Sequence, residues 1–441
     1  MAKRKRNREP ETAVIVSATH DGRGIADCDG KKVFVAGALP GETVEFKRRK
    51  FRRNFDEAEL LQVFEASPDR IEPKCAVFGR CGGCSLQHVS PDYQRDLKFQ
   101  TLKDNLQRIG NVTPAEWLEP MTGPEWRYRR RARLAVKDVH GKGRTLVGFR
   151  ERHAPYITDM HRCEVLVEPV DALIDPLSDM IGQLTIRTRL PQIELAVGEN
   201  AIAMVFRVLD PLTAEDQTHL SKFGEEHGIR IYLQPGGLDS LQLLYPTSID
   251  SPLQYTLPEF DLVIDFEPVD FVQVNGPINQ RMVHYAIEQL DPGEDDRVLD
   301  LFCGIGNFSL PLARRAGHVL GVEFEKTLVE RAGRNAASNG LDNVEFRAVD
   351  LAKIDGTEAW LKAGWDKLLL DPARSGAADV VERIELIDPQ RIVYVSCHPG
   401  TLARDAGTLV NEKGYSIERA GIIDMFPHTA HVESIAVFTK S

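Results

Sequence analysis

The sequence predicts an α/β protein with three parts: a small β-barrel, a mixed α+β middle and a C-terminal parallel sheet. Residues 11–65 alternate apolar and polar side chains between Asp-Gly and Pro-Gly turns, which is typical of short antiparallel strands. A cysteine cluster opens a stretch that mixes short helices with strands. From about residue 271 onward, strands alternate with helical stretches, which indicates βαβ units. We expect domains at 8–68, 69–270 and 271–441.

The distribution of charge and of apolar residues favours nucleic acid over a membrane as the partner. The net charge is −11, yet three basic clusters lie in the N-terminal third of the chain, at residues 3–8, 47–53 and 127–133. One such cluster is usually a solvated face, but three with interleaved Phe51 and Tyr128 favour contact with a nucleic-acid backbone. The chain begins without the apolar stretch of a signal peptide, and no apolar run approaches the length of a membrane span. We therefore expect a cytoplasmic protein.

The seven cysteines predict a metal centre rather than disulfides, because their number is odd and no export signal accompanies them. Cys75, Cys81 and Cys84 lie in one glycine-containing loop, and Cys163 is the best candidate for a fourth ligand. Three close cysteines with a remote fourth favour an iron-sulfur cluster, whereas structural zinc sites usually show two short pairs. Zinc is the alternative.

The C-terminal domain has the pattern of a nucleoside cofactor site. A strand at 297–301 leads into the glycine loop 303–307, where a ligand can approach the backbone closely. The next strand ends on Glu323, at the spacing of a ribose-binding carboxylate, and a third leads to Asp350, suitably placed for an adenine amino group. Because Ser309 stands where a dinucleotide fingerprint has its third glycine, S-adenosylmethionine (SAM) fits better than NAD.

Cys397 lies where a buried strand ends, at the edge where α/β sheets bind ligands. A strand-end cysteine alone is more often a packing residue. The neighbouring strand ends in Asp371-Pro-Ala-Arg, without the aromatic residue that N-methyltransferases use to stack an amine-bearing base. The predicted methyl acceptor is therefore carbon. A thiolate that adds to C6 of uracil makes C5 nucleophilic enough to accept a methyl group.

This chemistry needs a base that removes the C5 proton before the thiolate can leave. Glu433, at the start of the last strand, is the predicted base, and His428 and His431 are lesser options. Asp371 is expected to contact the uracil edge or the cofactor. A uracil within RNA must be flipped out or already unpaired to reach such a site, which agrees with the basic N-terminal clusters.

Together these motifs resemble the bacterial 23S ribosomal RNA (uracil-5-)-methyltransferases of the RumA/RlmD type over nearly the whole chain. Residues 21–26 and 35–42 match the family's N-terminal TRAM barrel, which is OB-like, and 271–275 match the Phe-x-Gln-x-Asn segment that opens its domain. The resemblance implies a Rossmann-like class I SAM-dependent methyltransferase that acts on 23S rRNA, with neither a membrane nor an obligatory protein partner. It also implies a [4Fe-4S] cluster on Cys75, Cys81, Cys84 and Cys163, Cys397 as nucleophile, Glu433 as base, and Gln273, Phe302, Asn307, Glu323, Asp350 and Asp371 around cofactor and substrate.

Two positions depart from the family pattern. Ala373 replaces the second proline of Asp-Pro-Pro-Arg, and His398 replaces the Asn that commonly follows the nucleophile. Because an imidazole can alter the pKa of a neighbouring thiol, we expect the pH profile of methylation to depend on His398. Two other functions fit parts of the chain: a tRNA uracil-5 methyltransferase, which usually lacks the barrel and cysteine cluster, and an iron-sulfur RNA-binding or redox-sensing protein with a vestigial methyltransferase domain.

Overall fold

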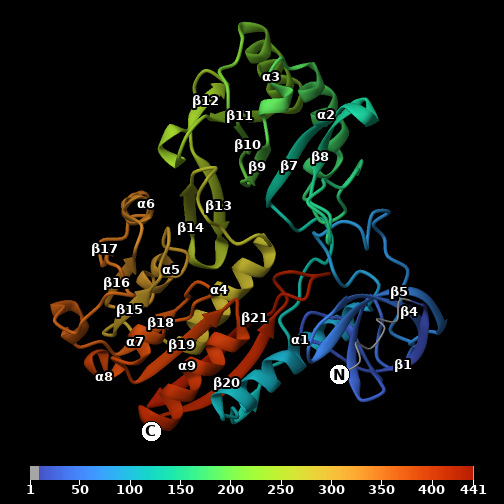
Figure 1. Cartoon of the computed structure of the whole chain (residues 1–441). Coiled ribbons are helices and arrows are strands. Elements are labelled where there is room, and N and C mark those ends of the chain that lie inside the picture. Colours follow the sequence, from blue (N-terminus) through green and yellow to red (C-terminus); the bar gives the residue numbers. More distant parts are fainter. Residues whose placement is uncertain (1–8, 441) are drawn as a thin grey trace.

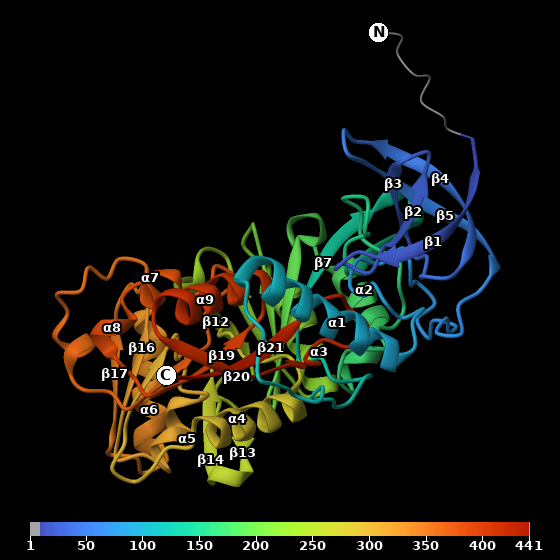
Figure 2. The same ribbon diagram turned by 90° about the horizontal axis from the view of Figure 1, so that it is seen from below.

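The structure is a computed structural model that describes residues 9–440, seen from two sides in Figures 1 and 2. The basic cluster at residues 3–8 lies outside the described residues. Three lobes are visible in Figure 1: the barrel in blue, the middle domain in green, and the C-terminal domain in orange and red. Within the described part of the chain, no helix is both long and apolar enough to cross a membrane.

The N-terminal strands close into the predicted barrel, in the order β1-β2-β3-β5-β4. Alternate side chains point inward, among them Ile15, Val33 and Phe46, which are almost fully buried. The pairs are antiparallel except β3 with β5, which is parallel because β5 returns from β4 to close the barrel beside β3. The strands are β1 (Glu11–Ala18), β2 (Gly24–Cys28), β3 (Lys31–Ala36), β4 (Thr43–Phe51) and β5 (Phe55–Glu65).

The middle domain is built on a six-stranded sheet in the order β12-β11-β10-β9-β7-β8. The elements are β7 (Arg131–Val139), β8 (Arg144–Gly148), α2 (Ile174–Gln183), β9 (Gln192–Val197), β10 (Ile202–Arg207), α3 (Ala214–His227), β11 (Ile229–Gln234) and β12 (Gln242–Tyr245). A hairpin of β13 (Leu253–Leu257) and β14 (Leu262–Phe266) leads into the last domain.

The C-terminal domain has an eight-stranded sheet in the order β17-β16-β15-β18-β19-β21-β20-β6, in which β6 (Glu116–Trp117) comes from earlier in the chain. The strands from β15 to β19 pair in parallel, as the βαβ pattern predicts, and β21 runs antiparallel to both β19 and β20. The strands are β15 (Arg297–Leu301), β16 (His318–Glu323), β17 (Val344–Ala348), β18 (Lys367–Leu370), β19 (Arg391–Ser396), β20 (Tyr415–Ile423) and β21 (Glu433–Lys440).

Helices cover both faces of this sheet (Figure 2). Leu368 and Leu370 of β18 pack with the side of the sheet that α9 covers, whereas Leu369 between them packs with the opposite side and α4. This alternation leaves no polar face on the central strands, which is typical of parallel sheets. The helices are α4 (Gly276–Leu290), α5 (Ser309–Ala313), α6 (Lys326–Ser338), α7 (Ala378–Val381), α8 (Ile384–Ile387) and α9 (Pro399–Glu412).

A segment from within residues 69–270 completes this sheet. The short strand β6 (Glu116–Trp117) pairs in parallel with β20 at the sheet edge. The preceding helix α1 (Pro91–Asn105) and the π-helical turn Leu106–Gly110 pack against α9. The approach is so close that a Cβ on Gly110 would lie 2.4 Å from the carbonyl oxygen of Ala403. The C-terminal domain is therefore joined to the cysteine-bearing region by packing as well as by the chain.

Candidate active site

The predicted cofactor and substrate residues lie along one edge of the C-terminal sheet. Asp350, Glu323, Phe302, Asp371 and Cys397 stand at or just after the carboxyl ends of β17, β16, β15, β18 and β19, which is the spatial order of these strands. In open α/β sheets the ligand binds outside this edge. The fold therefore brings together residues that are distant in the chain, since Phe302 and Cys397 are 95 positions apart.

The glycine loop after β15 has the backbone conformation of a ligand cradle. Phe302, Gly304 and Gly306 all have positive φ, of 67°, 55° and 95°. A Cβ on Gly304 would meet nothing within 4 Å, so the space beside it is open to a ligand. The amide of Gly304 donates to Oε2 of Glu323 at 3.2 Å, and the amide of Phe324 donates to Oε1 at 2.7 Å. Glu323 thereby braces the loop from the next strand.

Side chains from the middle domain and α4 hold the other side of this loop. Asn307 Oδ1 accepts hydrogen bonds from the Tyr255 hydroxyl at 2.9 Å and from Asn279 Nδ2 at 3.0 Å. The backbone carbonyl of Gln273 accepts from Nε of Arg130 at 2.8 Å. The sequence did not single out Tyr255 or Asn279, and it indicated Arg130 only as part of a basic cluster, because their partners lie far away along the chain.

The predicted nucleophile and base face each other across two paired strands. In the antiparallel register of β19 and β21, Ser396 is paired with Ser434, so the next pair outward is Cys397 and Glu433. Residues directly opposite in such a ladder have Cα atoms about 4.5 to 5.5 Å apart. Cys397 is half-buried, whereas Glu433 is only 3% exposed.

The charges around this pair disfavour its ionised forms. Burial raises the pKa of the Cys397 thiol to about 11, assisted by the negative charges of Glu433 and Asp371, while Arg374 acts in the opposite direction. Burial and Asp371 also raise the pKa of Glu433 well above its ordinary value, and burial raises the pKa of Asp371 to about 7. Arg374, the last residue of the Asp-Pro-Ala-Arg segment, is the cation that opposes these shifts at Cys397 and Glu433. A cationic ligand would be favoured at this position.

The two departures from the family pattern have local structural roles. His398 is the N-cap of α9, and its Nδ1 accepts a hydrogen bond from the amide of Thr401 at 3.2 Å. An Asn side chain can make the same kind of cap. Ala373 keeps the turn closed, because its carbonyl accepts from the amide of Gly376 at 2.9 Å. The dependence of the methylation pH profile on His398 stays a prediction.

A cleft of about 1300 Å³ opens onto Cys397. It is bounded by the barrel, by the loop that carries Cys84, by one side of α1 and by the residues around the nucleophile. His431 lines this cleft, whereas the more distant His428 is 1% exposed and stacks on Trp126 with ring centroids 3.8 Å apart. Of the three candidate bases, Glu433 is the one that the strand register sets opposite Cys397, and its role as the base stays a prediction.

The four predicted cluster ligands surround one small cavity of about 20 Å³. The residues that line it include Cys75, Cys81, Cys84 and Cys163. Burial raises the pKa of the Cys84 thiol to about 11 and that of Cys163 to about 12. Among the described residues, no three His, Cys, Asp or Glu side chains are close enough to form a site for a single metal ion. Cys84 lines both this cavity and the large cleft.

The basic clusters are less available for phosphate contacts than the sequence indicated. Arg130 is buried against Gln273, and Arg131 donates to the carbonyls of Pro268 and Asp270. Arg48 forms ion pairs with Glu11 and Asp56 inside the barrel wall. The sequence cannot separate such structural guanidiniums from free ones, because their partners are distant. Other basic side chains of the barrel cluster, Arg49, Lys50 and Arg52, are more than half exposed although each faces a glutamate.

The fold and the residues at the edge of the C-terminal sheet are those of a Rossmann-like methyltransferase joined to a small barrel. Residues 249–441 match the family model described as tRNA (Uracil-5-)-methyltransferase. Over its whole length, the chain is similar to the Pyrococcus abyssi tRNA (uracil-54, C5)-methyltransferase solved with S-adenosyl-L-homocysteine. The TM-score is 0.76 and the identity 25%, over 97% of this chain and 99% of the other.

Two curated relatives are more similar in sequence. The 23S rRNA (uracil(1939)-C(5))-methyltransferase RlmD of Methylococcus capsulatus is 50% identical over 98% of this chain and 97% of its own. RlmD of Stenotrophomonas maltophilia is 48% identical over 98% of both chains. The chain belongs to this family of RNA (uracil-C5)-methyltransferases, which confirms the resemblance seen in the sequence.

Proposed function

We propose that this protein transfers a methyl group from SAM to C5 of one specific uridine in 23S rRNA. The observation that carries the proposal is the register that sets Cys397 opposite Glu433, where Cys397 opens onto a cleft shared with the barrel. The names of the relatives at 48% to 50% identity support the 23S rRNA substrate. The absence of an aromatic residue after Asp371-Pro372 supports carbon rather than nitrogen as the acceptor.

In this mechanism Cys397 reacts as the thiolate, after its proton has passed to solvent. Its sulfur forms a bond to C6 of the uracil, and the electrons of the C5–C6 double bond move toward C5 and O4. Bound SAM supplies the methyl group to C5 and leaves as S-adenosylhomocysteine. Glu433 then removes the C5 proton, the double bond re-forms, and the bond between C6 and the Cys397 sulfur breaks. The raised pKa of Glu433 suits it to accept a proton from carbon in a buried site.

Different residues at the sheet edge would bind SAM and the uracil. Asp350 and Glu323 would face the nucleoside of SAM, with the glycine loop against its sulfur end. Gln273, Phe302, Asn307 and Asp371 would line the space between cofactor and uracil. The positive sulfonium charge of SAM would offset the acidic groups beside Cys397 and lower the pKa of the thiol.

The RNA would enter through the large cleft. Phe34, which lines it, stacks on Phe55 with ring centroids 4.7 Å apart, and the Arg23 guanidinium lies 5.0 Å from the Phe34 ring. Arg23 also lines the cleft. An aromatic ring next to a guanidinium is suited to stacking an unpaired base and neutralising a phosphate. The barrel would thus present single-stranded RNA to Cys397.

We further propose a [4Fe-4S] cluster on Cys75, Cys81, Cys84 and Cys163, with zinc as the alternative. Four thiols around one cavity support it, two of them (Cys81 and Cys163) buried and two partly buried, because thiolates shielded from water need a cationic centre to offset their charge. The amide of Gly83 points to the Cys81 sulfur at 3.4 Å, as expected near a thiolate ligand. Anaerobic purification followed by iron, sulfide and zinc analysis distinguishes the two metals.

The direct test is methylation in vitro with radiolabelled SAM and three RNAs: a 23S rRNA transcript, the same transcript with the modified uridine changed to cytidine, and a tRNA pool. We expect 5-methyluridine at one position of the first RNA alone, and none with Cys397→Ala. Labelling of tRNA without labelling of 23S rRNA would contradict the substrate and favour the tRNA alternative.

A further inference from the structure

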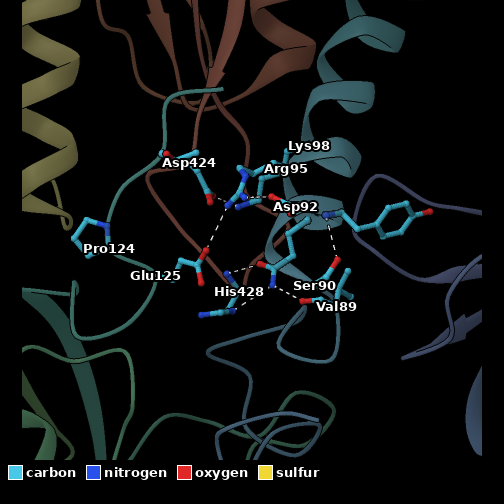
Figure 3. A network of polar contacts seen from close by, with 12 residues as sticks. Val89, Ser90, Asp92, Arg95, Lys98, Pro124, Glu125, Asp424 and His428 are labelled. Carbon is cyan, nitrogen blue, oxygen red and sulfur yellow. Dashed lines mark hydrogen bonds and ion pairs between the residues drawn. The ribbon is translucent and has the colours of Figure 1, made fainter. Parts of the chain in front are cut away.

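The loop between β20 and β21, residues 424–432, ends at Glu433 and is held by three other parts of the chain (Figure 3). At its start, Asp424 forms a buried ion pair with Lys98 of α1 at 2.6 Å. At its centre, His428 lies between α1, the cysteine loop and the ring of Trp126. The proposed base therefore depends for its position on residues outside its own domain.

The cysteine loop contacts this catalytic loop directly after Cys84. The amides of Ser85 and Leu86 both donate to the carbonyl oxygen of His428 at 2.9 Å. In the opposite direction, the amide of Ala430 donates to Oγ of Ser85 at 3.1 Å. A shift of the cysteine loop would therefore shift the backbone three residues before Glu433.

Gln94 of α1 also contacts both the catalytic loop and the segment that follows the cysteine loop. Its Oε1 accepts from the amide of His428 at 2.8 Å, and its Nε2 donates to the carbonyl of Val89 at 2.8 Å. The same Nε2 lies 3.3 Å from Nδ1 of His428. Gln94 is 2% exposed and His428 is 1% exposed. His428 has a φ of 64°, so the contacts hold it in a conformation that non-glycine residues seldom adopt.

We infer that Gln94 and His428 are positioning residues that hold Glu433 for proton abstraction by clamping the catalytic loop to the cysteine loop. The inference rests on the proposed function, in which Glu433 acts after the methyl group has moved. Loosening the clamp then leaves the first bond formation and methyl transfer intact. It delays the final elimination, so protein accumulates bound through Cys397 to the methylated uracil.

The test compares Gln94→Met and His428→Asn with the wild type and with Arg95→Ala. Methionine keeps the length of Gln94 without its hydrogen bonds, and Asn tolerates positive φ at position 428. Arg95 is the matched control, since it adjoins Gln94 on α1 and forms ion pairs with Asp92 and Glu125 (Figure 3). Two variants are used so that a folding failure of one leaves the other informative.

Three quantities are measured with RNA that carries ordinary uridine at the target position. They are the rate of methyl transfer in a single turnover, the steady-state turnover rate, and the fraction of protein bound covalently to RNA on a denaturing gel. For both clamp variants we expect methyl transfer within about twofold of wild type, turnover slowed about 10- to 100-fold, and an accumulated adduct. Arg95→Ala should match the wild type in all three. Equal slowing of transfer and turnover, or no excess adduct, would overturn the inference.

Glu433→Gln is the reference for the proposed chemistry itself. It should accumulate the same adduct, because the C5 proton can no longer be removed efficiently. If Glu433→Gln traps RNA and the clamp variants do not, the clamp is wrong and the mechanism stands. If Glu433→Gln traps nothing, the proposed role of Glu433 fails, and the clamp fails with it.

Discussion

The buried ion pair between Lys98 and Asp424 should be one of the most sensitive points of the structure. Their side chains are 2% and 5% exposed, and Nζ of Lys98 lies 2.6 Å from Oδ1 of Asp424 and 2.9 Å from the carbonyl of Phe426. Lys98→Met leaves a buried carboxylate without its cation. Removing one partner of such a pair costs about 3 to 5 kcal/mol of the free energy of unfolding.

Removing both charges should restore much of this loss. In Lys98→Met/Asp424→Leu the buried carboxylate is gone, and the carbonyl of Phe426 keeps its hydrogen bonds from the hydroxyl and the amide of Thr429, at 2.9 and 3.3 Å. The remaining cost is the lost hydrogen bond from Lys98 to this carbonyl, about 1.5 to 3 kcal/mol. We expect the double variant to be more stable than Lys98→Met alone, although it carries one more substitution. The desolvation of the charges explains this sign, because apolar groups of similar volume can replace a buried pair.

The assay is equilibrium unfolding in urea, followed by tryptophan fluorescence, with all variants matched in iron and zinc content. Arg95→Ala serves as control, since the Asp92 side chain of its pair is 91% exposed and such pairs contribute at most about 1 kcal/mol. The reasoning is refuted if Lys98→Met costs no more than Arg95→Ala, or if the double variant is less stable than the single one.

Three further predictions test the electrostatics and the metal centre. The rate at which iodoacetamide alkylates Cys397 should increase with pH up to about 11, the pKa of the thiol. Arg374→Gln should raise this pKa and slow alkylation at pH 9. Alkylation rates that mass spectrometry finds unchanged in this variant would contradict the prediction. Burial raises the pKa of Asp300 to about 8, so its contribution to stability is full below about pH 4 and is lost as pH rises through 8. Asp300→Asn should therefore reduce the decrease of the unfolding free energy with pH between pH 4 and 8, by up to about 1.4 kcal/mol per pH unit in urea unfolding. An unchanged pH dependence would exclude this contribution of Asp300. Cys163→Ser should lower the iron content and thermal midpoint together, whereas full iron content would remove Cys163 from the ligand set.

The sequence predicted the positions of strands and helices well where the signal is local. The strand expected to end on Glu323 is β16, which does end there. Cys397 follows β19 and Glu433 opens β21, as the apolar runs on either side of them indicated. Burial of a short apolar run and the ends of that run are properties of consecutive residues, so a single sequence carries them.

The contacts that hold the site together could not be predicted in this way. Lys98 and Asp424 are 326 residues apart in the chain, and Gln94 and His428 are 334 apart. Gln94 lies on a helix whose sequence is mostly polar, so its burial follows only from the packing of α1 beside the catalytic loop. The buried Arg130, which reads as part of a basic cluster, depends in the same way on a carbonyl from another domain.

The central claim is that Cys397 bonds transiently to the uracil during methyl transfer. An RNA substrate with 5-fluorouridine at the modified position has no C5 proton to remove, so the reaction should stop after methyl transfer. With saturating SAM, mass spectrometry of the wild-type protein should find the RNA and one added methyl group attached at Cys397, and Cys397→Ala should give none. A wild-type protein that methylates ordinary RNA but forms no such adduct would contradict the account.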